Sequence, residues 1–260
     1  MIIGYANDFE ATLHAELERR GVDYVAIEGD RYELGKGDAS RTIFLGNVRR
    51  DFVRDGDASA IVRFLDNVIA SVGALPSGWE DAAPHLFPML ESSVVERGPD
   101  TVAREKSPHT VVALAYHVEG SGSVRFIRYS DLESWGISPA EAWDRAQASL
   151  DGRAAEVNVR ILEAGDIRLG ALEAHEPDKA SILLSGSLRS RVESKLGWPV
   201  YAVAPARDFV YLIGADKFDE IGRLGGVVAR EFNESGHPLS TEVWELSDEG
   251  LEPVGNFPAR

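Results

Sequence analysis

Residues 199–214 read PVYAVAPARDFVYLIG and form two apolar runs separated by Pro205-Ala206-Arg207-Asp208. Neither run alternates between apolar and polar residues, as a strand with one face in water would. Continuous apolar runs of this length are typical of strands that are covered on both faces. The stretch therefore predicts two neighbouring buried strands, joined by a turn that contains Arg207 and Asp208.

Helical patterns lie on both sides of these two strands. Asp178 can cap a helix that closes at Gly197, and a second helix is predicted to begin at Asp216. The second helix contains Gly225-Gly226. Because glycine destabilises a helix interior, two adjacent glycines there indicate either close backbone packing, which we favour, or a sequence that tolerates the loss.

The remaining chain alternates short strands with helices. Three strand candidates follow the first helix, near residues 24–27, 31–34 and 42–45, and two hairpins are predicted at 111–129 and 157–172. Most strands meet their neighbours through short turns instead of helical crossovers. This pattern indicates the α+β class, with mainly antiparallel sheets, helices packed on them, and repeated αββ-type units.

The most polar stretch, residues 96–108, has no apolar pattern to bury. It predicts a boundary between an N-terminal α+β part, residues 1–98, and a C-terminal α+β part, residues 109–260. The first part would consist of a helix, a three-stranded meander and a second helix. The two parts could also pack as one unit.

The composition excludes several classes of protein. The 260 residues include no cysteine, which excludes disulfides, cysteine-bound zinc and thiol catalysis. We find no signal-peptide pattern at the start of the chain and no apolar run of about 20 residues, the length needed to cross a bilayer. The sequence therefore predicts a cytoplasmic protein that does not enter a membrane.

The formal net charge is −16, from 43 acidic and 27 basic residues. Nucleic-acid binding draws most of its affinity from lysine and arginine, so this balance disfavours nucleic acid and anionic membranes as partners. The simplest interpretation is a soluble surface that repels copies of itself. The alternative is an acidic face that binds a basic partner.

Four short blocks in the C-terminal third resemble one known family. They are Asp178-Lys179-Ala180-Ser181, Val203-Ala204-Pro205 followed by Asp208, Pro238-Leu239-Ser240, and Gly250-Leu251-Glu252-Pro253-Val254. In order and separation these blocks resemble the YtpQ-like family of bacterial proteins, a domain of unknown function. Phe87-Pro88 and residues 135–150 resemble the family more loosely. The resemblance implies a bacterial protein and no particular catalytic residue, because the family has no established activity.

We find no signature of a catalytic or cofactor-binding site. Ser185-Gly186-Ser187 lies inside a helical pattern and lacks the glycines of a nucleophile elbow. Phosphate-binding loops, dinucleotide fingerprints, zinc-protease motifs and calcium loops do not occur. The sequence therefore predicts no catalytic residue and no cofactor.

His175 is the histidine with the most neighbouring carboxylates, in the segment from Glu173 to Asp178. One imidazole and two carboxylates can bind a metal ion. A second histidine is not close in sequence, and Asp178 already has a role as a helix cap. A solvated loop is the simpler interpretation, so His175 is only a weak candidate and no metal is predicted.

The turn between the two buried strands carries the strongest candidate for a ligand contact. Arg207 and Asp208 can be a local charge pair that shapes the turn. In the alternative, Arg207 grips an anionic group, Asp208 orients it, and His237 lies nearby across the sheet. The planar guanidinium suits a carboxylate or a phosphate.

These observations favour a non-enzymatic module that binds another protein through a sheet edge or an acidic surface. The helix–meander–helix opening resembles small acidic secretion-chaperone folds, so chaperone-like or immunity-like binding is one specific form of this hypothesis. The alternative is a hydrolase or transferase that acts on an anionic small molecule through Arg207, Asp208 and His237. Convergence of these three side chains in one pocket would favour the enzyme.

Overall fold

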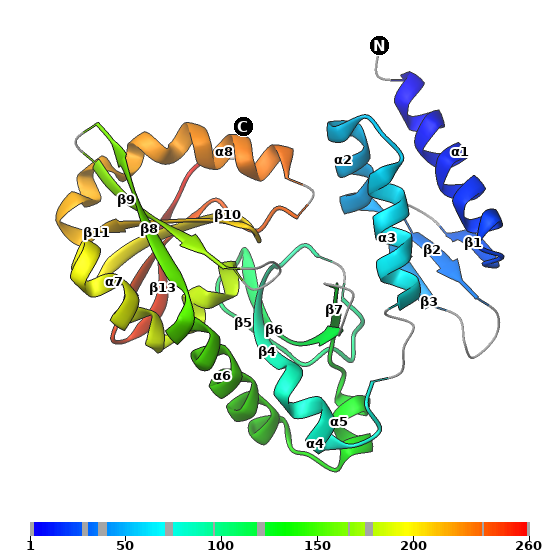
Figure 1. The fold of residues 1–260 in the computed structure, drawn as a ribbon, viewed down its shortest axis with the longest axis horizontal. Coiled ribbons are helices and arrows are strands. Elements are labelled where there is room, and N and C mark those ends of the chain that lie inside the picture. The colour runs from blue at the N-terminus through cyan, green and yellow to red at the C-terminus, as the bar shows by residue number, and fades with distance from the viewer. Residues whose placement is uncertain are drawn as a thin grey trace. The chain divides into compact units, whose positions relative to one another are not determined.

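The computed structural model describes residues 3–27, 31–35, 41–70, 75–95, 97–118, 123–165, 167–174, 179–235 and 237–258. The chain divides into two compact units (Figure 1). The N-terminal unit consists of Met1–Gly73 with Glu234–His237, and the C-terminal unit consists of Ala74–Asn233 with Pro238–Arg260.

The N-terminal unit contains a three-stranded antiparallel sheet with β2 in the centre. Its elements are, in chain order, α1 (Ile3–Arg19), β1 (Tyr24–Ile27), β2 (Arg31–Leu34), β3 (Arg41–Phe44), α2 (Gly46–Asp55) and α3 (Ser59–Ala70). The three strands lie where the sequence predicts them.

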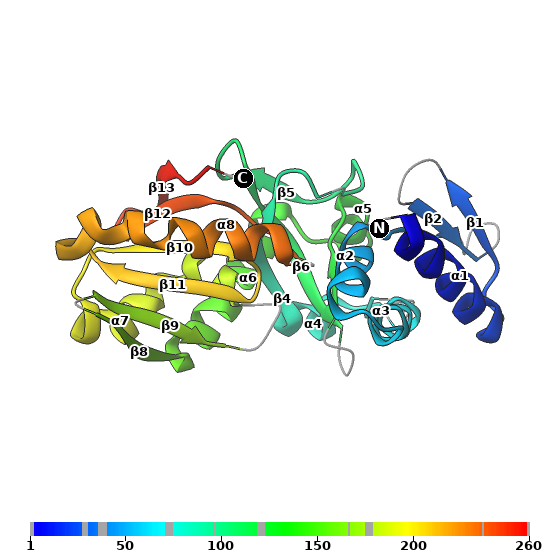
Figure 2. The ribbon, with the colours of Figure 1, turned by 90° about the horizontal axis from the view of Figure 1, so that it is seen from above.

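The helices of this unit cover one face of the sheet (Figure 2). In β2, buried Tyr32 and Leu34 alternate with half-exposed Arg31 and Glu33, which is the period of a strand with one covered face. The buried side chains pack with fully buried residues of the helices, namely Phe9, Leu13 and Leu17 of α1 and Ile61 and Leu65 of α3. The other face of the sheet carries no helix of this unit.

The C-terminal unit contains two antiparallel sheets. The four-stranded sheet consists of β4 (Leu86–Ser92), β5 (Ala103–Glu105), β6 (Thr110–Val118) and β7 (Ser123–Phe126). The six-stranded sheet has the order β13-β12-β10-β11-β9-β8, and its strands are β8 (Asn158–Ala164), β9 (Ile167–Glu173), β10 (Val200–Ala206), β11 (Phe209–Gly214), β12 (Glu242–Ser247) and β13 (Gly250–Asn256).

Helices and short 3-10 turns pack around these sheets. They are α4 (Trp79–Ala82), η2 (Ala83–His85), α5 (Tyr129–Trp135), α6 (Pro139–Glu156), η3 (Ala180–Leu184), η4 (Gly186–Leu188), α7 (Arg189–Leu196), η5 (Ala215–Leu224) and α8 (Gly225–Glu234). Ser138 caps α6 by accepting the backbone N–H of Glu141 at 3.2 Å, with Pro139 in the first turn. Within the described ranges, no helix is long and apolar enough to span a bilayer.

The decisive stretch forms β10 and β11 in the middle of the six-stranded sheet, and it is covered on both faces. Ala202 and Ala204 belong to a core that also contains Leu150 of α6 and Val192 of α7. Val203, which points the other way, belongs to a second core with residues of η5 and α8. The prediction of two neighbouring, doubly covered strands is therefore confirmed.

The α+β class with helices and several antiparallel sheets is also confirmed. The repeated αββ grouping is not confirmed, because the three sheets have three, six and four strands. The division of the chain differs from the predicted one: β4 pairs along its whole length with β6, from Leu86↔Tyr116 to Ser92↔Thr110. A boundary at residues 98–109 would separate these two partners, whereas the observed division precedes both of them.

The predicted helix from Asp178 to Gly197 has a different structure. Asp178 lies outside the described residues, and the helical conformation is interrupted at Ser185, which is extended (φ −101°, ψ 125°). The Ser185 hydroxyl accepts the backbone N–H of Ser187 at 3.2 Å and so caps a new helical turn, η4. Serine competes with the helix in this way because its side chain can satisfy the backbone locally.

Gly214, the last residue of β11, occupies a position that no other residue fits. A Cβ added there would lie 2.4 Å from the carbonyl oxygen of Leu196, which is backbone and cannot swing away. The predicted close packing at Gly225-Gly226 holds for Gly225, whose Cβ would meet the Phe257 ring at 3.0 Å, but a Cβ on Gly226 would meet nothing within 4 Å.

We therefore expect opposite effects from the same substitution at two glycines. Gly214→Ala should lower the stability of the C-terminal unit by about 1–3 kcal/mol through overpacking. Gly226→Ala, in the helix α8, should raise it by up to about 1 kcal/mol. All five tryptophans lie in the C-terminal unit, so tryptophan emission during urea unfolding measures this unit. Equal midpoints for the two variants would contradict the expected crowding at Gly214.

Candidate functional site

The turn between β10 and β11 is fixed by a buried ion pair. The guanidinium of Arg207 forms a salt bridge with the carboxylate of Glu91 in β4 (Nη2 to Oε2). The Glu91 side chain is 1% exposed and that of Arg207 is 15% exposed. The other carboxylate oxygen of Glu91 accepts the backbone N–H of Ser92 at 2.8 Å. The pair therefore connects the four-stranded sheet to the six-stranded sheet.

Hydrogen bonds bring two further segments, at Ala180-Ser181 and at Leu239, to this turn. The carbonyl of Arg207 accepts the N–H of Ala180 at 3.0 Å, and the carbonyl of Pro205 accepts the N–H of Leu239 at 2.8 Å. The Ser181 hydroxyl accepts the N–H of Leu90 in β4 at 3.1 Å. We call this set the inter-sheet junction; its residues are Leu90, Glu91, Ala180, Ser181, Pro205, Arg207 and Leu239.

A second buried carboxylate, Glu242 of β12, is 4% exposed. It accepts hydrogen bonds from the hydroxyls of Ser240 (2.8 Å) and Ser107 (3.0 Å). The Ser107 hydroxyl also lies 2.8 Å from that of Thr110. This arrangement satisfies the carboxylate inside the protein, as a buried polar group requires.

Of the predicted site residues, Arg207 and His237 each lie next to one member of a β-bridge, Ala206↔Pro238. Arg207 faces the buried Glu91, while Asp208 is exposed at the tip of the turn. His237 belongs to the N-terminal unit, where its backbone N–H is donated to the Ser235 hydroxyl at 2.9 Å. Two pockets in the described part of the chain, of about 460 and 310 Å³, are not lined by any of these three residues.

The metal hypothesis is not tested at His175, which lies outside the described residues. In the ranges that the structure describes, no three His, Cys, Asp or Glu side chains are grouped so that they could hold a metal ion.

The inter-sheet junction is built to hold the two sheets together. An anion that took the place of Glu91 at Nη2 of Arg207 would leave that carboxylate buried without its cation. Removing one partner of a buried pair is strongly unfavourable. The geometry therefore favours the structural interpretation of Arg207, a residue that shapes the turn, over the interpretation in which it grips a ligand.

A second polar cluster lies in the N-terminal unit, and the sequence interpretation missed it. The carboxylate of Glu10 in α1 accepts hydrogen bonds from the Tyr32 hydroxyl (2.7 Å) and from Arg49 of α2 (2.6 Å). His14 Nε2 lies 2.8 Å from the Tyr32 hydroxyl, and its ring stacks on Tyr24 at 4.9 Å. The spacing of Glu10 and His14, four residues apart on one helix face, is the only signal in the sequence.

The environment of this cluster changes two pKa values. Burial raises the pKa of Glu10, but the hydrogen bonds from Arg49 and Tyr32 outweigh burial, so the pKa lies below its ordinary value. Burial and the hydrogen bond to Glu10 raise the pKa of the Tyr32 phenol. The cluster therefore holds a carboxylate and a neutral phenol at pH 7, and it ties α1 to β2 and α2.

No family model, curated protein or solved structure matches the chain.

We expect the Glu91–Arg207 pair to be worth much more to stability than an exposed pair. Arg207→Ala should lower the free energy of unfolding of the C-terminal unit by about 3–5 kcal/mol, because Glu91 stays buried as an unpaired charge. The double variant Glu91→Leu/Arg207→Met should recover most of this loss, since neither charge is left alone. Urea unfolding followed by tryptophan emission measures both variants.

The matched control is Arg160→Ala. Arg160 Nε lies 3.1 Å from Glu173 Oε1 in a pair that is 61% and 44% exposed. Exposed pairs contribute about 1 kcal/mol or less. A loss for Arg207→Ala no greater than that of the control would refute the structural role of the junction.

The Glu10 cluster should stabilise the N-terminal unit in a pH-dependent way. Because the folded pKa of Glu10 is lowered, its contribution is present above the unfolded value of about 4.3 and is lost as the pH falls through the folded value. Glu10→Gln should therefore weaken the unit by about 0.5–1 kcal/mol at pH 7, a small effect because the carboxylate is 38% exposed and screened by solvent. As the pH falls below about 4.3 the difference should shrink, and it should vanish once the pH lies below the lowered folded value.

Because the chain contains no cysteine, a single introduced cysteine can report selectively on opening of this unit. Ala60 is 5% exposed in the core of the N-terminal unit, so the labelling rate of an Ala60→Cys background by dithiodipyridine follows opening of that unit. Glu18→Gln, on the same helix but outside the cluster, is the control. If the Glu10 and Glu18 variants open at the same rate at pH 7, the cluster does not stabilise the unit.

Proposed function

We propose that the protein is a non-enzymatic interaction module, and that β1 of the N-terminal unit binds an extended segment of another protein. The observation that supports this proposal is an edge strand with exposed apolar side chains. Strand addition uses the free backbone groups of a sheet edge for affinity and alternate side chains for specificity.

Strand β1 pairs with β2 on one side only, because the order of its sheet is β1-β2-β3. Val25 and Ile27 lie opposite Glu33 and Arg31 of β2, so both point to the face away from the helices. Val25 is 61% exposed and Ile27 is 36% exposed. The edge therefore offers apolar contacts beside its unpaired backbone groups.

The other outer strands carry the residues that normally protect an edge. Strand β13, at one end of the six-stranded sheet, contains Glu252 and Pro253, and β8, at the other end, contains Arg160 and Glu163. Charged residues and proline discourage pairing with another chain. Strand β1 reads YVAI and contains neither. This contrast singles out β1 as the edge that is open to a partner.

The chemistry of the partner follows from charge. With a net charge of −16, two copies of this chain repel each other, which disfavours pairing of β1 with β1. A segment in which β-branched apolar residues alternate with lysine or arginine would match both the apolar side chains and the acidic protein. We propose such a basic, extended segment as the occupant.

The cellular setting and the family stay proposals as well. We propose that the module acts in the bacterial cytoplasm, which the cysteine-free composition supports. Membership of the YtpQ-like family, proposed on the four sequence blocks, would add no activity. The alternative function, a hydrolase or transferase acting on an anionic small molecule through Arg207, Asp208 and His237, has less support because Arg207 faces Glu91.

A displayed library of random peptides, selected on the immobilised full-length protein, tests the proposal. We expect the selected peptides to alternate β-branched and basic residues, and to protect the amides of β1 from hydrogen exchange. Val25→Lys should weaken their binding at least tenfold, about 1.4 kcal/mol, by placing a cation at the edge. Val53→Lys is the matched control, since Val53 is 57% exposed on α2 in the same unit.

Three results would count against β1 as the binding edge. Equal losses for the two lysine variants would mean that the peptides respond only to overall charge. Protection confined to the C-terminal unit would place the binding elsewhere. A concentration-dependent dimer that Val25→Lys abolishes would identify a second copy, and not a partner protein, as the occupant.

A further inference from the structure

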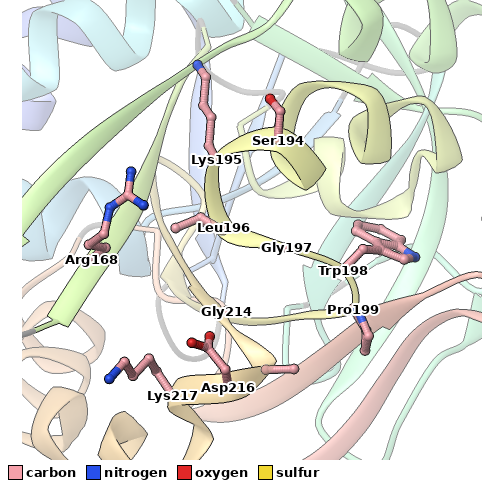
Figure 3. A pocket seen from close by; sticks show the side chains of 11 residues that line it. Arg168, Ser194, Lys195, Leu196, Gly197, Trp198, Pro199, Gly214, Asp216 and Lys217 are labelled. Carbon is pink, nitrogen blue, oxygen red and sulfur yellow. The ribbon is translucent and has the colours of Figure 1, made fainter.

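A pocket of about 460 Å³ lies in the C-terminal unit, beside the ends of the inner strands of the six-stranded sheet (Figure 3). It is formed where α7 ends, β10 begins, β11 ends and β9 begins. Residues from the start of η5, including Asp216 and Lys217, complete it. Volumes of this size are typical of sites for small molecules.

Two cations in this pocket are available to a ligand. Arg168 of β9 and Lys217 of η5 are both exposed, and Figure 3 shows them on the same side of the pocket. The side chain of neither forms a hydrogen bond or an ion pair with any other residue that the structure describes. Lys195 differs from them, because its Nζ donates to the carbonyl of Val159 at 2.6 Å.

The shape of the pocket depends on two glycines in the neighbouring strands. Gly214 allows β11 to approach the carbonyl of Leu196, which would lie 2.4 Å from an added Cβ. Gly170 of β9 accommodates the Leu196 side chain, whose Cδ1 would lie 2.7 Å from an added Cβ. The end of α7 is thus drawn against the sheet, and the loop from Gly197 to Pro199 forms the opposite wall.

We propose that this pocket binds a small organic anion that also carries a hydrogen-bond donor. Arg168 and Lys217 bind its carboxylate or phosphate, for which the planar guanidinium provides two parallel donors. The carboxylate of Asp216, which also lines the pocket, accepts a hydroxyl or ammonium of the same ligand. The charges of both signs thus select a ligand that carries both groups. This site is independent of the β1 edge, which lies in the other unit.

Isothermal titration calorimetry of the full chain with four probes tests the proposal. Phosphoserine and serine carry an anion and donors, whereas inorganic phosphate and acetate carry the anion without an ammonium or alcohol group. We expect phosphoserine or serine to bind at least tenfold more tightly than its matching simple anion. Which of the two binds more tightly distinguishes a phosphate site from a carboxylate site.

Charge-removing variants locate the binding. Arg168→Gln and Lys217→Gln should each raise the dissociation constant of the bound probe at least tenfold. Asp216→Asn should remove the preference for the donor-bearing probe but leave the affinity for the simple anion unchanged. Arg145→Gln on α6 is the matched control, because Arg145 is exposed and also has no partner among the described residues. All four positions are exposed, so tryptophan emission should show unchanged folding.

Two outcomes would overturn the site. One is the lack of saturable binding for all four probes at millimolar concentration. The other is an equal loss of affinity for Arg145→Gln and Arg168→Gln, which would mean that only the general field of the protein attracts the anion.

Discussion

The buried ion pair between Glu91 and Arg207 is the constraint on which the C-terminal unit depends. Strand β4 is an outer strand of its sheet, yet all seven of its residues are buried, because η3 and the turn after β10 lie against it. A carboxylate in that position has lost its water, and the guanidinium of Arg207 replaces the lost hydration. Such a pair adds little net stability compared with apolar residues of the same volume. Removal of only one of its two charges, however, strongly destabilises the fold. The relative position of the two sheets is therefore defined by charge as well as by packing.

This use of charge inside the unit changes where a function can be sought. The arginine that looked most suited to an anionic ligand is paired with a carboxylate of the same chain, and Asp208 beside it is exposed at the tip of the turn. The surfaces that remain open lie elsewhere. One is an apolar strand edge in the N-terminal unit, and the other is a pocket with two cations at the end of the larger sheet. Occupation of either surface would leave the junction undisturbed, so under the proposals made here recognition and structural stability would depend on different residues.

The sequence predicted what is local and missed what joins distant segments. The apolar runs of 199–214 required strands covered on both faces, and Ser138-Pro139 required a helix start; both are present. Nothing near Arg207 in sequence indicates Glu91, because the two are 116 residues apart and meet only after two sheets have formed. The apolar spacing of residues 178–197 favoured one continuous helix. Ser185 interrupts that helix because its hydroxyl offers the backbone a competing hydrogen-bond partner. The pocket at Arg168 depends on Gly170 and Gly214, whose role appears only when the backbones are brought together.

The unprotected edge of β1 also sets conditions for handling the protein. An uncovered strand with exposed valine and isoleucine is a template for aggregation, and the mutual repulsion of copies with a charge of −16 is what opposes it. Salt shortens the reach of that repulsion from about 10 Å at 0.1 M to about 3 Å at 1 M. Concentrated solutions at high salt, or at a pH near the isoelectric point of about 4.8, therefore lose the charge repulsion that opposes pairing of β1 with another chain. Dilute buffer at neutral pH preserves it.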